Sequence, residues 1–279
     1  MKFSILIANY NNGKYFKDCF QSLLSQNYQN WEAVIIDDVS TDDSIEVIKK
    51  MVENDNRFRI YHNKNNSGVG FTKSRLIELA EGEICGFVDP DDAILPTAIS
   101  SSIKIYQKKP DVVLTYSLFT KCDENLNPKD IFNGGKQVVN QSPYFFNNPI
   151  EIAHFVTFKK KIYNQTEKMD TSMKIAEDQD LYLKMYEKGK VYFINESNYL
   201  YRMHSGGISQ NENKQKSREY FAKVIFNAMK RRNLKKINGR PVPYEFKNAD
   251  EIYSLLAYQN TLISKIKRKI IIVIQQIFN

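Results

Sequence analysis

The sequence predicts an α/β fold: a mainly parallel, Rossmann-like central sheet flanked by helices, with a helical extension at the C-terminal end. Short apolar runs alternate with segments whose apolar residues recur at helical spacing, and this alternation is typical of parallel sheets. Clusters of polar residues follow four of the apolar runs. Because such sheets bind ligands at the carboxyl ends of their strands, the clusters indicate a binding site.

The first half of the chain supplies most of the predicted sheet. Short runs rich in Val, Ile and Phe predict strands at residues 3–8, 33–36, 58–61, 84–88 and 112–116. Between the strands, apolar residues recur every three or four positions, often after a capping Asp, Ser or Gly. This spacing predicts helices at residues 15–24, 45–52, 71–80 and 95–107.

The second half is less regular. Residues 120–176 contain several Pro and Gly and few periodic runs, so we expect loops and short strands there. A helix is predicted from Glu177 to Gly189, followed by strands at residues 191–194 and 199–201. Two further helices, 212–232 and 249–264, are predicted on either side of a proline-containing linker.

The composition is that of an ordinary globular protein. Apolar residues make up 42% and charged residues 26%, which excludes a disordered or collagen-like chain. Cys19, Cys85 and Cys122 are far apart, which excludes a disulfide scaffold and a cysteine zinc site. We therefore expect a cytoplasmic protein whose N-terminus is a strand rather than a signal peptide, and which has no membrane-spanning segment.

The net charge of +8 comes from the C-terminal part of the chain. Residues 216–279 hold fourteen Lys and Arg but only four Asp and Glu. Lys230-Arg231-Arg232 is part of this excess and is expected to add to a basic surface patch. The charge therefore does not indicate nucleic-acid binding by the whole protein. Basic residues at 265–269 precede an apolar run at 270–274. Such a segment either lies on an anionic membrane surface, or packs its apolar side on the main domain or on a second subunit.

The sharpest motif is Asp89-Pro90-Asp91-Asp92, directly after the fourth predicted strand. Three carboxylates in four residues repel one another unless a cation lies between them. Hard oxygen ligands of this kind suit Mg²⁺ or Mn²⁺. The alternative is an exposed acidic turn that caps the next helix.

Two further clusters carry groups that suit a phosphorylated ligand. Asp37 and Asp38 end the second strand beside Ser40, where carboxylates can accept from a base and the hydroxyl can reach a ribose or a phosphate. Gly68 and Lys73 lie at the start of a helix, where backbone N–H groups attract anions. The alternative for Asp37 and Asp38 is capping of the next helix. The glycines match neither the dinucleotide fingerprint nor the phosphate-loop pattern.

Glu177 and Asp178 open the helix predicted after the irregular region. The helix dipole favours ionised carboxylates at this position, so one of them could act as a general base. The alternative is an acidic first turn that only stabilises the helix.

Taken in order, these segments resemble family 2 glycosyltransferases with the GT-A fold, of the bacterial surface-glycan type. The resemblance covers about residues 3–209. It rests on the start Asn9-Tyr10-Asn11, the segments 21–26 and 35–42, the acidic motif with its trailing Pro96, the Glu177-Asp178 pair, and the tract 199–204.

The resemblance implies an inverting enzyme that uses a nucleotide sugar, with UDP as the expected nucleotide, and a divalent metal, Mn²⁺ or Mg²⁺. It implies that Asp178 deprotonates the acceptor hydroxyl. The metal is expected at Asp91, Asp89 and His204, with Asp92 close by. Arg202 is expected to approach the diphosphate or the metal, and Glu177 is a further expected site residue beside Asp178. The implied nucleotide-binding residues are Ala8, Tyr10, Asp37, Asp38, Ser40, Gly68, Lys73, Asp89, Pro90 and Asp91.

Three positions depart from the family pattern. Lys73 stands where an arginine is usual, which keeps the charge but loses the bidentate geometry. Ser74 stands where an asparagine is common, and Val39 where a glycine or asparagine is common. His62 and His154 lie outside the resembling motifs, and we interpret both as structural.

The resemblance also divides the chain. We expect a catalytic domain at residues 1–211, in which residues 1–118 bind the nucleotide and 119–211 a glycan or lipid-linked acceptor, followed by a basic helical extension at 212–279. The expected location is the cytoplasm, at the inner face of the cell membrane. The main alternative is a catalytically silent sugar-nucleotide-binding or assembly protein. A nucleic-acid-binding tail is a second alternative, without a recognition motif to support it.

Overall fold

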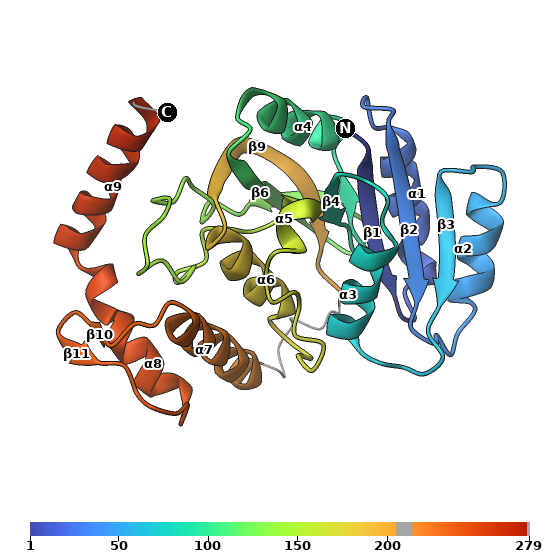
Figure 1. The fold of residues 1–279 in the computed structure, drawn as a ribbon. Helices are drawn as coiled ribbons and strands as arrows, with labels where there is room; N and C mark the ends of the chain where they lie inside the picture. Colours follow the sequence, from blue (N-terminus) through green and yellow to red (C-terminus); the bar gives the residue numbers. More distant parts are fainter. Residues whose placement is uncertain (205–213, 278–279) are drawn as a thin grey trace.

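The computed structural model describes residues 1–204 and 214–277. Its centre is one curled sheet with helices packed on both sides (Figure 1). Within the described residues this sheet has nine strands, eight of them in the order β3-β2-β1-β4-β8-β6-β9-β5, with β7 paired to β6. The four strands β3, β2, β1 and β4 run parallel, and so do β6 and β9. The predicted α/β class with a helical extension is confirmed.

The strands of the main sheet are short except for β6 and β9. Their bounds are β1 Phe3–Asn9, β2 Trp31–Asp37, β3 Phe58–His62, β4 Ile84–Phe87, β5 Ala93–Ile94, β6 Val112–Cys122, β7 Pro128–Ile131, β8 Thr157–Lys159 and β9 Lys190–Arg202. A separate two-stranded sheet pairs β10 (Lys236–Ile237) with β11 (Arg240–Pro241), where the sequence predicts a linker.

The helices follow the strands in the predicted alternation. Their bounds are α1 Phe16–Leu24, α2 Ser44–Val52, α3 Val69–Leu79, α4 Ala98–Lys108, α5 Lys160–Tyr163, α6 Glu177–Tyr186, α7 Lys214–Arg231, α8 Ala249–Leu256 and α9 Leu262–Ile277. The helix predicted at 212–232 corresponds to α7, but its predicted start lies outside the described residues. The predicted domain boundary at 211/212 also lies outside them.

Alternate side chains of the central strands pack into two cores, one on each face of the sheet. On β1, Phe3, Ile5 and Ile7 belong to the core that contains residues of α1, α2 and α4, whereas Leu6 belongs to the core that contains residues of α3, α6, α7 and α8. The five side chains from Phe3 to Ile7, including the polar Ser4, are all buried. A strand that is buried on both faces appears in the sequence as a continuous apolar run.

Two elements differ from the prediction. The strands predicted at residues 191–194 and 199–201 form the single strand β9, which pairs with β6 across three register shifts. The helix predicted at 249–264 is broken, because Thr261 adopts extended backbone and its Oγ1 accepts a hydrogen bond from the Ser264 N–H (3.3 Å) at the start of α9.

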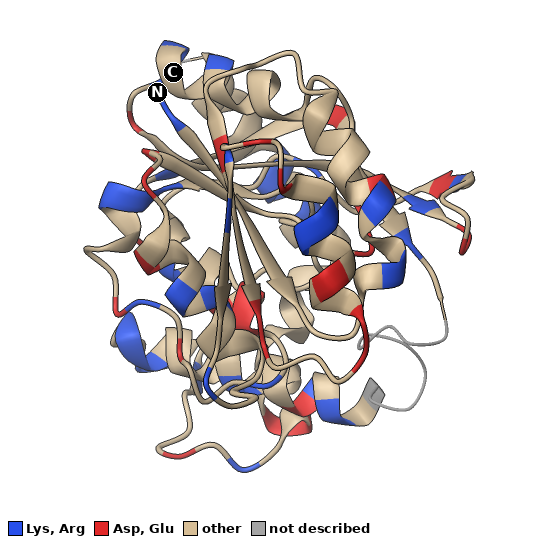
Figure 2. Ribbon diagram, turned by 90° about the vertical axis from the view of Figure 1, so that its right-hand side faces the viewer, with Lys and Arg blue, Asp and Glu red and all other residues tan. Residues whose placement is uncertain are grey.

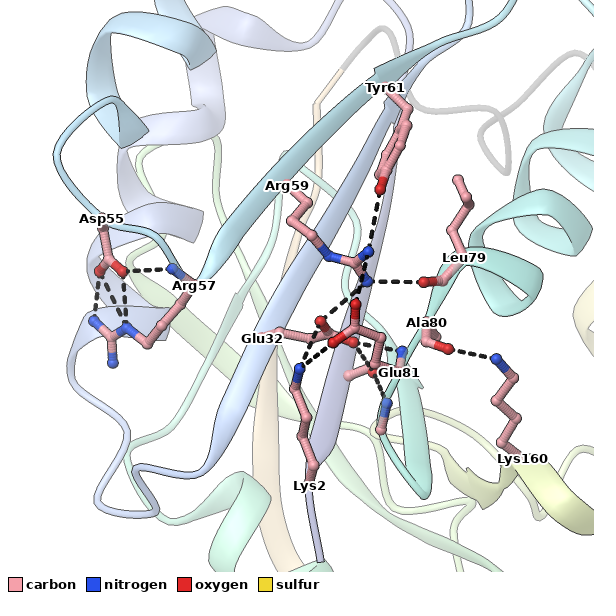
Figure 3. Close-up of polar contacts among 12 residues, drawn as sticks. Lys2, Glu32, Asp55, Arg57, Arg59, Tyr61, Leu79, Ala80, Glu81 and Lys160 are labelled. Carbon is pink, nitrogen blue, oxygen red and sulfur yellow. Dashed lines mark hydrogen bonds and ion pairs between the residues drawn. The ribbon is translucent and has the colours of Figure 1, made fainter.

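A buried carboxylate ties the amino ends of the first three strands together (Figure 3). Glu32 accepts hydrogen bonds from Ser4 Oγ (2.6 Å) and from the Glu81 N–H (2.6 Å), and pairs with Lys2 Nζ and Arg59 Nη2, each at 3.0 Å. Burial raises the pKa of Glu32, but these donors outweigh burial and hold the pKa below its usual value. The network stabilises the end of the sheet opposite the polar clusters.

Several predicted surface charges are used inside the protein. Arg231 and Arg232 both pair with Glu187, at 2.9 and 2.8 Å, and their side chains are largely buried. The expectation that both join a basic surface is therefore wrong. On the side of the molecule shown in Figure 2, acidic and basic residues are interspersed over the helices and loops. No helix within the described residues is long and apolar enough to cross a membrane.

Candidate functional site

The polar clusters lie at the carboxyl ends of the parallel strands, as predicted. Asn9 ends β1 opposite Asp37, which ends β2. The acidic loop at residues 89–92 follows β4, and α3 begins one residue after Gly68. Because β2, β1 and β4 are neighbours in the sheet, these segments meet along one edge.

Asp37 and Ser40 hold the loop after β1. The buried Asp37 carboxylate accepts hydrogen bonds from Asn9 Nδ2 (2.9 Å) and from Ser40 Oγ (2.5 Å) and N–H (3.1 Å). Ser40 Oγ in turn accepts from the Asn11 N–H (3.0 Å). Tyr10, carried by this loop, is 45% exposed and available to a ligand. The half-buried Ala8 precedes it on β1.

Asp38 organises the approach to α3. Its carboxylate accepts from Asn63 Nδ2 (2.6 Å) and from the N–H groups of Ser67 (3.0 Å) and Gly68 (2.8 Å). Gly68 has a φ of +83°, a conformation that favours glycine. The Gly68 N–H is therefore directed to Asp38 in this structure, and the loop is fixed by the same carboxylate that the resemblance assigns to the base.

Asp92 anchors the acidic loop to β9. It is buried and accepts from Tyr199 OH (2.7 Å) and from the Arg202 N–H (2.7 Å). Burial raises the pKa of Asp92 well above its usual value, and the negative charges of Asp89 and Asp91 raise it further. The sequence motif thus combines one structural carboxylate with two that are more accessible.

Asp91 and His204 form the pair with metal-binding chemistry. Asp91 Oδ2 lies 2.8 Å from His204 Nε2, and the His204 ring packs on Tyr15 with centroids 4.7 Å apart. Burial, then the charge of Asp89, raises the pKa of Asp91, although His204 opposes the shift. A bound cation would relieve this repulsion. No group of three or more His, Cys, Asp or Glu side chains in the described chain is arranged to hold a metal ion, but Mg²⁺ needs only one or two protein carboxylates beside phosphate oxygens.

Arg202 contacts the acidic loop from the carboxyl end of β9. Its Nε donates to the Asp91 carbonyl (2.6 Å), its Nη1 to the Glu124 carbonyl, and its Nη2 to Asp18 (2.7 Å). The side chain is 2% exposed. The guanidinium therefore holds the acidic loop from within the protein, and its expected approach to the diphosphate or the metal stays a prediction.

Lys73, Glu177 and Asp178 form a charged cluster between α3 and α6. Lys73 Nζ donates to Glu177 Oε1 at 2.7 Å. Burial lowers the pKa of Lys73, but Glu177, Asp89 and Asp178 outweigh burial and raise it, so the ammonium stays charged. Burial and the neighbouring Glu177 raise the pKa of Asp178 to about 6, although Lys73 opposes them. Asp178 is thus suited to take up a proton near neutral pH.

His154 belongs to this cluster, although the sequence gives no signal for it. Its ring stacks on Tyr199 (centroids 4.7 Å apart, 18° between planes) and lies near Tyr201. Burial lowers the pKa of His154, and the negative charge of Asp89 is the largest effect that opposes this shift. Within residues 1–204 and 214–277, neither ring nitrogen has a hydrogen-bond partner. The lowered pKa indicates a neutral imidazole near the charges of Asp89 and Lys73.

Comparison with known proteins points to one family. A model described as glycosyl transferase family 2 matches residues 4–166, more than half of the chain. Glycosyltransferase GlyG of Streptococcus pneumoniae is 29% identical over 227 residues, 75% of this chain and 73% of its own length. Chondroitin synthase of Escherichia coli is 28% identical over 86% of this chain, but the match spans only 34% of that enzyme.

Solved structures show the fold. The S. aureus TarS 1–349 complex with UDP-GlcNAc superposes with a TM-score of 0.65 and 18% identity, over 92% of this chain and 71% of TarS 1–349. The mannosyltransferase PcManGT of Pyrobaculum calidifontis, in complex with GDP-Man and Mn²⁺, superposes with a TM-score of 0.59 and 12% identity, over 95% of this chain and 77% of that chain. The predicted GT-A fold is thereby confirmed.

Proposed function

Since the chain belongs to glycosyl transferase family 2 and is a glycosyltransferase, we propose that it transfers a hexosyl or N-acetylhexosaminyl group from a UDP-linked sugar to a hydroxyl of a glycan or lipid-linked acceptor. The observation that carries the proposal is Asp178, whose pKa of about 6 suits a general base, in the cluster that Lys73 and Asp89 share. We further propose inversion by a single displacement, so that the enzyme needs no nucleophile.

The nucleotide is assigned to the loops after β1 and β2. The neighbour TarS binds UDP and UDP-GlcNAc, which supports UDP as the nucleotide here. Asp38 Oδ2 accepts one hydrogen bond from within the protein, so a lone pair remains for a base N–H. Asp89, whose carboxylate has no hydrogen-bond or ion-pair partner within the described residues, would accept from the ribose.

Asp91 and His204 would hold a divalent metal, Mn²⁺ or Mg²⁺, with Asp89 in support. The fit rests on the 2.8 Å approach of Asp91 to His204 and on the raised pKa of Asp91 beside Asp89. A metal at this position supplies positive charge to the diphosphate as the nucleotide leaves. Lys73 uses one donor on Glu177 and keeps two for the same diphosphate.

Asp178 would take the proton of the acceptor hydroxyl as that oxygen attacks the anomeric carbon. Glu177 keeps Lys73 in place and raises the pKa of Asp178. We assign residues 1–118 to the nucleotide and 119–211 to the acceptor, and the reaction to the cytoplasm at the inner face of the cell membrane. Contact with that membrane, or self-association, is assigned to the C-terminal helix.

Two variants test the assignment. Calorimetric titration with UDP, GDP and dTDP, with and without Mn²⁺, should show base-selective, metal-dependent binding that Asp91→Ala removes. Transfer from the UDP-sugar that binds should fall at least about a hundredfold in Asp178→Asn, while UDP binding remains. Asp43→Asn, at an exposed position directly before α2 whose side chain makes no capping hydrogen bond, is the matched control and should change neither. UDP binding without turnover of any donor would favour the catalytically silent protein instead.

A further inference from the structure

Helix α9 is attached to the rest of the protein by one side only. Its half-buried residues are Ser264, Arg268, Ile272 and Gln275, and its other described residues are exposed. Because an α-helix has about 3.6 residues per turn, these four positions form one stripe. Arg268 Nη1 lies 3.5 Å from Glu151, and Gln275 exchanges two hydrogen bonds with the Asn140 backbone, at 2.9 and 3.1 Å. The stripe therefore faces the body of the protein.

The apolar residues of α9 lie on the opposite side. Seven large side chains fall within an arc of about 120°, whose centre is opposite the attached stripe. They are between 48% and 73% exposed: Leu262, Ile263, Ile266, Ile270, Val273, Ile274 and Ile277. In Figure 1, α9 stands at the edge of the molecule, away from the sheet. The helix thus presents a continuous apolar face outward, where the rest of the described chain does not cover it.

The charges around this face indicate what covers it. Lys267 borders one edge of the apolar arc and Lys269 the other, and Lys265 lies next to Lys269. Helix α9 contains no Asp or Glu. Two copies packed through this face would bring lysines together without acidic partners. An anionic lipid surface accepts the apolar side chains and neutralises the lysines at both edges.

We infer that α9 binds flat on an anionic membrane surface, with its apolar face at the boundary of headgroups and acyl chains and its lysines at the headgroups. The attached stripe then fixes the orientation of the catalytic domain on the membrane. The inference rests on the proposed membrane location, but it does not depend on catalysis. Vesicle binding is measured without a sugar donor, so its failure would leave the proposed transfer reaction untouched.

The test is sedimentation of the full chain with vesicles of phosphatidylcholine that contain about one quarter phosphatidylglycerol. The double variant Ile270→Gln/Ile274→Gln should bind these vesicles about tenfold more weakly than the wild type. Ile271→Gln is the matched control, because Ile271 is 42% exposed but lies outside the apolar arc. It should bind like the wild type. Equal circular dichroism spectra would show that all three proteins are folded.

A second pair of measurements separates charge from self-association. Lys267→Gln/Lys269→Gln should bind the anionic vesicles about tenfold more weakly than the wild type at low salt. On vesicles of pure phosphatidylcholine, the wild type and this variant should bind equally weakly. Sedimentation velocity should show a monomer without vesicles. Absence of vesicle binding, an equal loss in Ile271→Gln, or a dimer that Ile270→Gln/Ile274→Gln dissociates would each overturn the inference.

Discussion

The pKa of Asp178 predicts how transfer depends on pH. If Asp178 is the general base, only its ionised form is active. With a pKa of about 6, about nine tenths of the enzyme is active at pH 7 and about one tenth at pH 5. The acid limb of kcat/KM, which reports on the free enzyme, should therefore have its midpoint near pH 6, with about a tenfold loss from pH 7 to pH 5.

The neighbours of Asp178 predict the sign of each change in that limb. Burial is the main cause of the raised pKa, and Glu177 adds to it, whereas Lys73 opposes it. Glu177→Gln removes a negative neighbour, so the limb should move to lower pH. Lys73→Met removes the positive neighbour, so the limb should move to higher pH. In Glu177→Gln the loss between pH 7 and pH 5 should be smaller than tenfold, and it almost vanishes if the pKa reaches the ordinary 3.8.

The assay is initial-rate transfer from the UDP-sugar at low donor concentration between pH 5 and pH 8. The position of the limb is measured rather than the rate, because Lys73→Met also removes a proposed diphosphate contact. Glu53→Gln, an exposed substitution at the end of α2, should leave the limb in place. A limb that stays near pH 6 in both cluster variants, or moves in the same direction in both, would refute the assignment of Asp178 as the titrating base.

Two further predictions concern the network at the opposite end of the sheet and the histidine in the site. Glu32→Ala should lower the free energy of unfolding by about 3 kcal/mol, because it leaves the Ser4 hydroxyl and the Glu81 N–H without their buried acceptor. In urea unfolding, the exposed Glu81→Ala should cost at most about 1 kcal/mol. The loss of unfolding free energy in Glu32→Ala should be complete above pH 4.5, the ordinary pKa of Glu32. It should shrink as the pH falls through the lower pKa that Glu32 has in the folded protein. His154→Phe keeps the stacking on Tyr199 but removes the ring nitrogens, so the transfer rate should fall about tenfold. The thermal midpoint of unfolding should stay unchanged. A lower midpoint together with the lower rate would indicate a structural role for His154.

Most of the first half of the fold could be predicted because each strand and helix there is a local pattern. Strands β1 and β2 are continuous apolar runs, since both faces are buried. Strand β9 could not be predicted as one element, because the polar residues around Glu196 interrupt its pattern and the distant strand β6 supplies its pairing. The break at Thr261 depends on a single capping hydrogen bond, which periodicity does not reveal.

The positions of the site residues could be predicted better than their partners. Polar residues after β1, β2 and β4 meet because the sheet order brings those strand ends together. The sequence does not show which atoms then form hydrogen bonds with these polar side chains. Asp38 is used by the 63–68 loop, and Arg202 by Asp18 and two carbonyls. The roles in binding that the resemblance assigns to Asp38 and to Arg202 stay predictions.

His154 shows why the remaining part of the site could not be predicted. It lies in the irregular region, where neither period nor motif gives a signal, and it reaches the site through its stacking on Tyr199 of β9. Tyr199 also donates to Asp92, whose carboxylate anchors the acidic loop. The Tyr199 side chain therefore contacts both the proposed metal-binding loop and the His154 ring. Tyr199 and Arg202 lie on β9, and His204 follows the end of the strand by two residues. Because Asp92 accepts from Tyr199 and from the Arg202 N–H, and Asp91 contacts His204, this one strand places the partners of both carboxylates of the acidic loop.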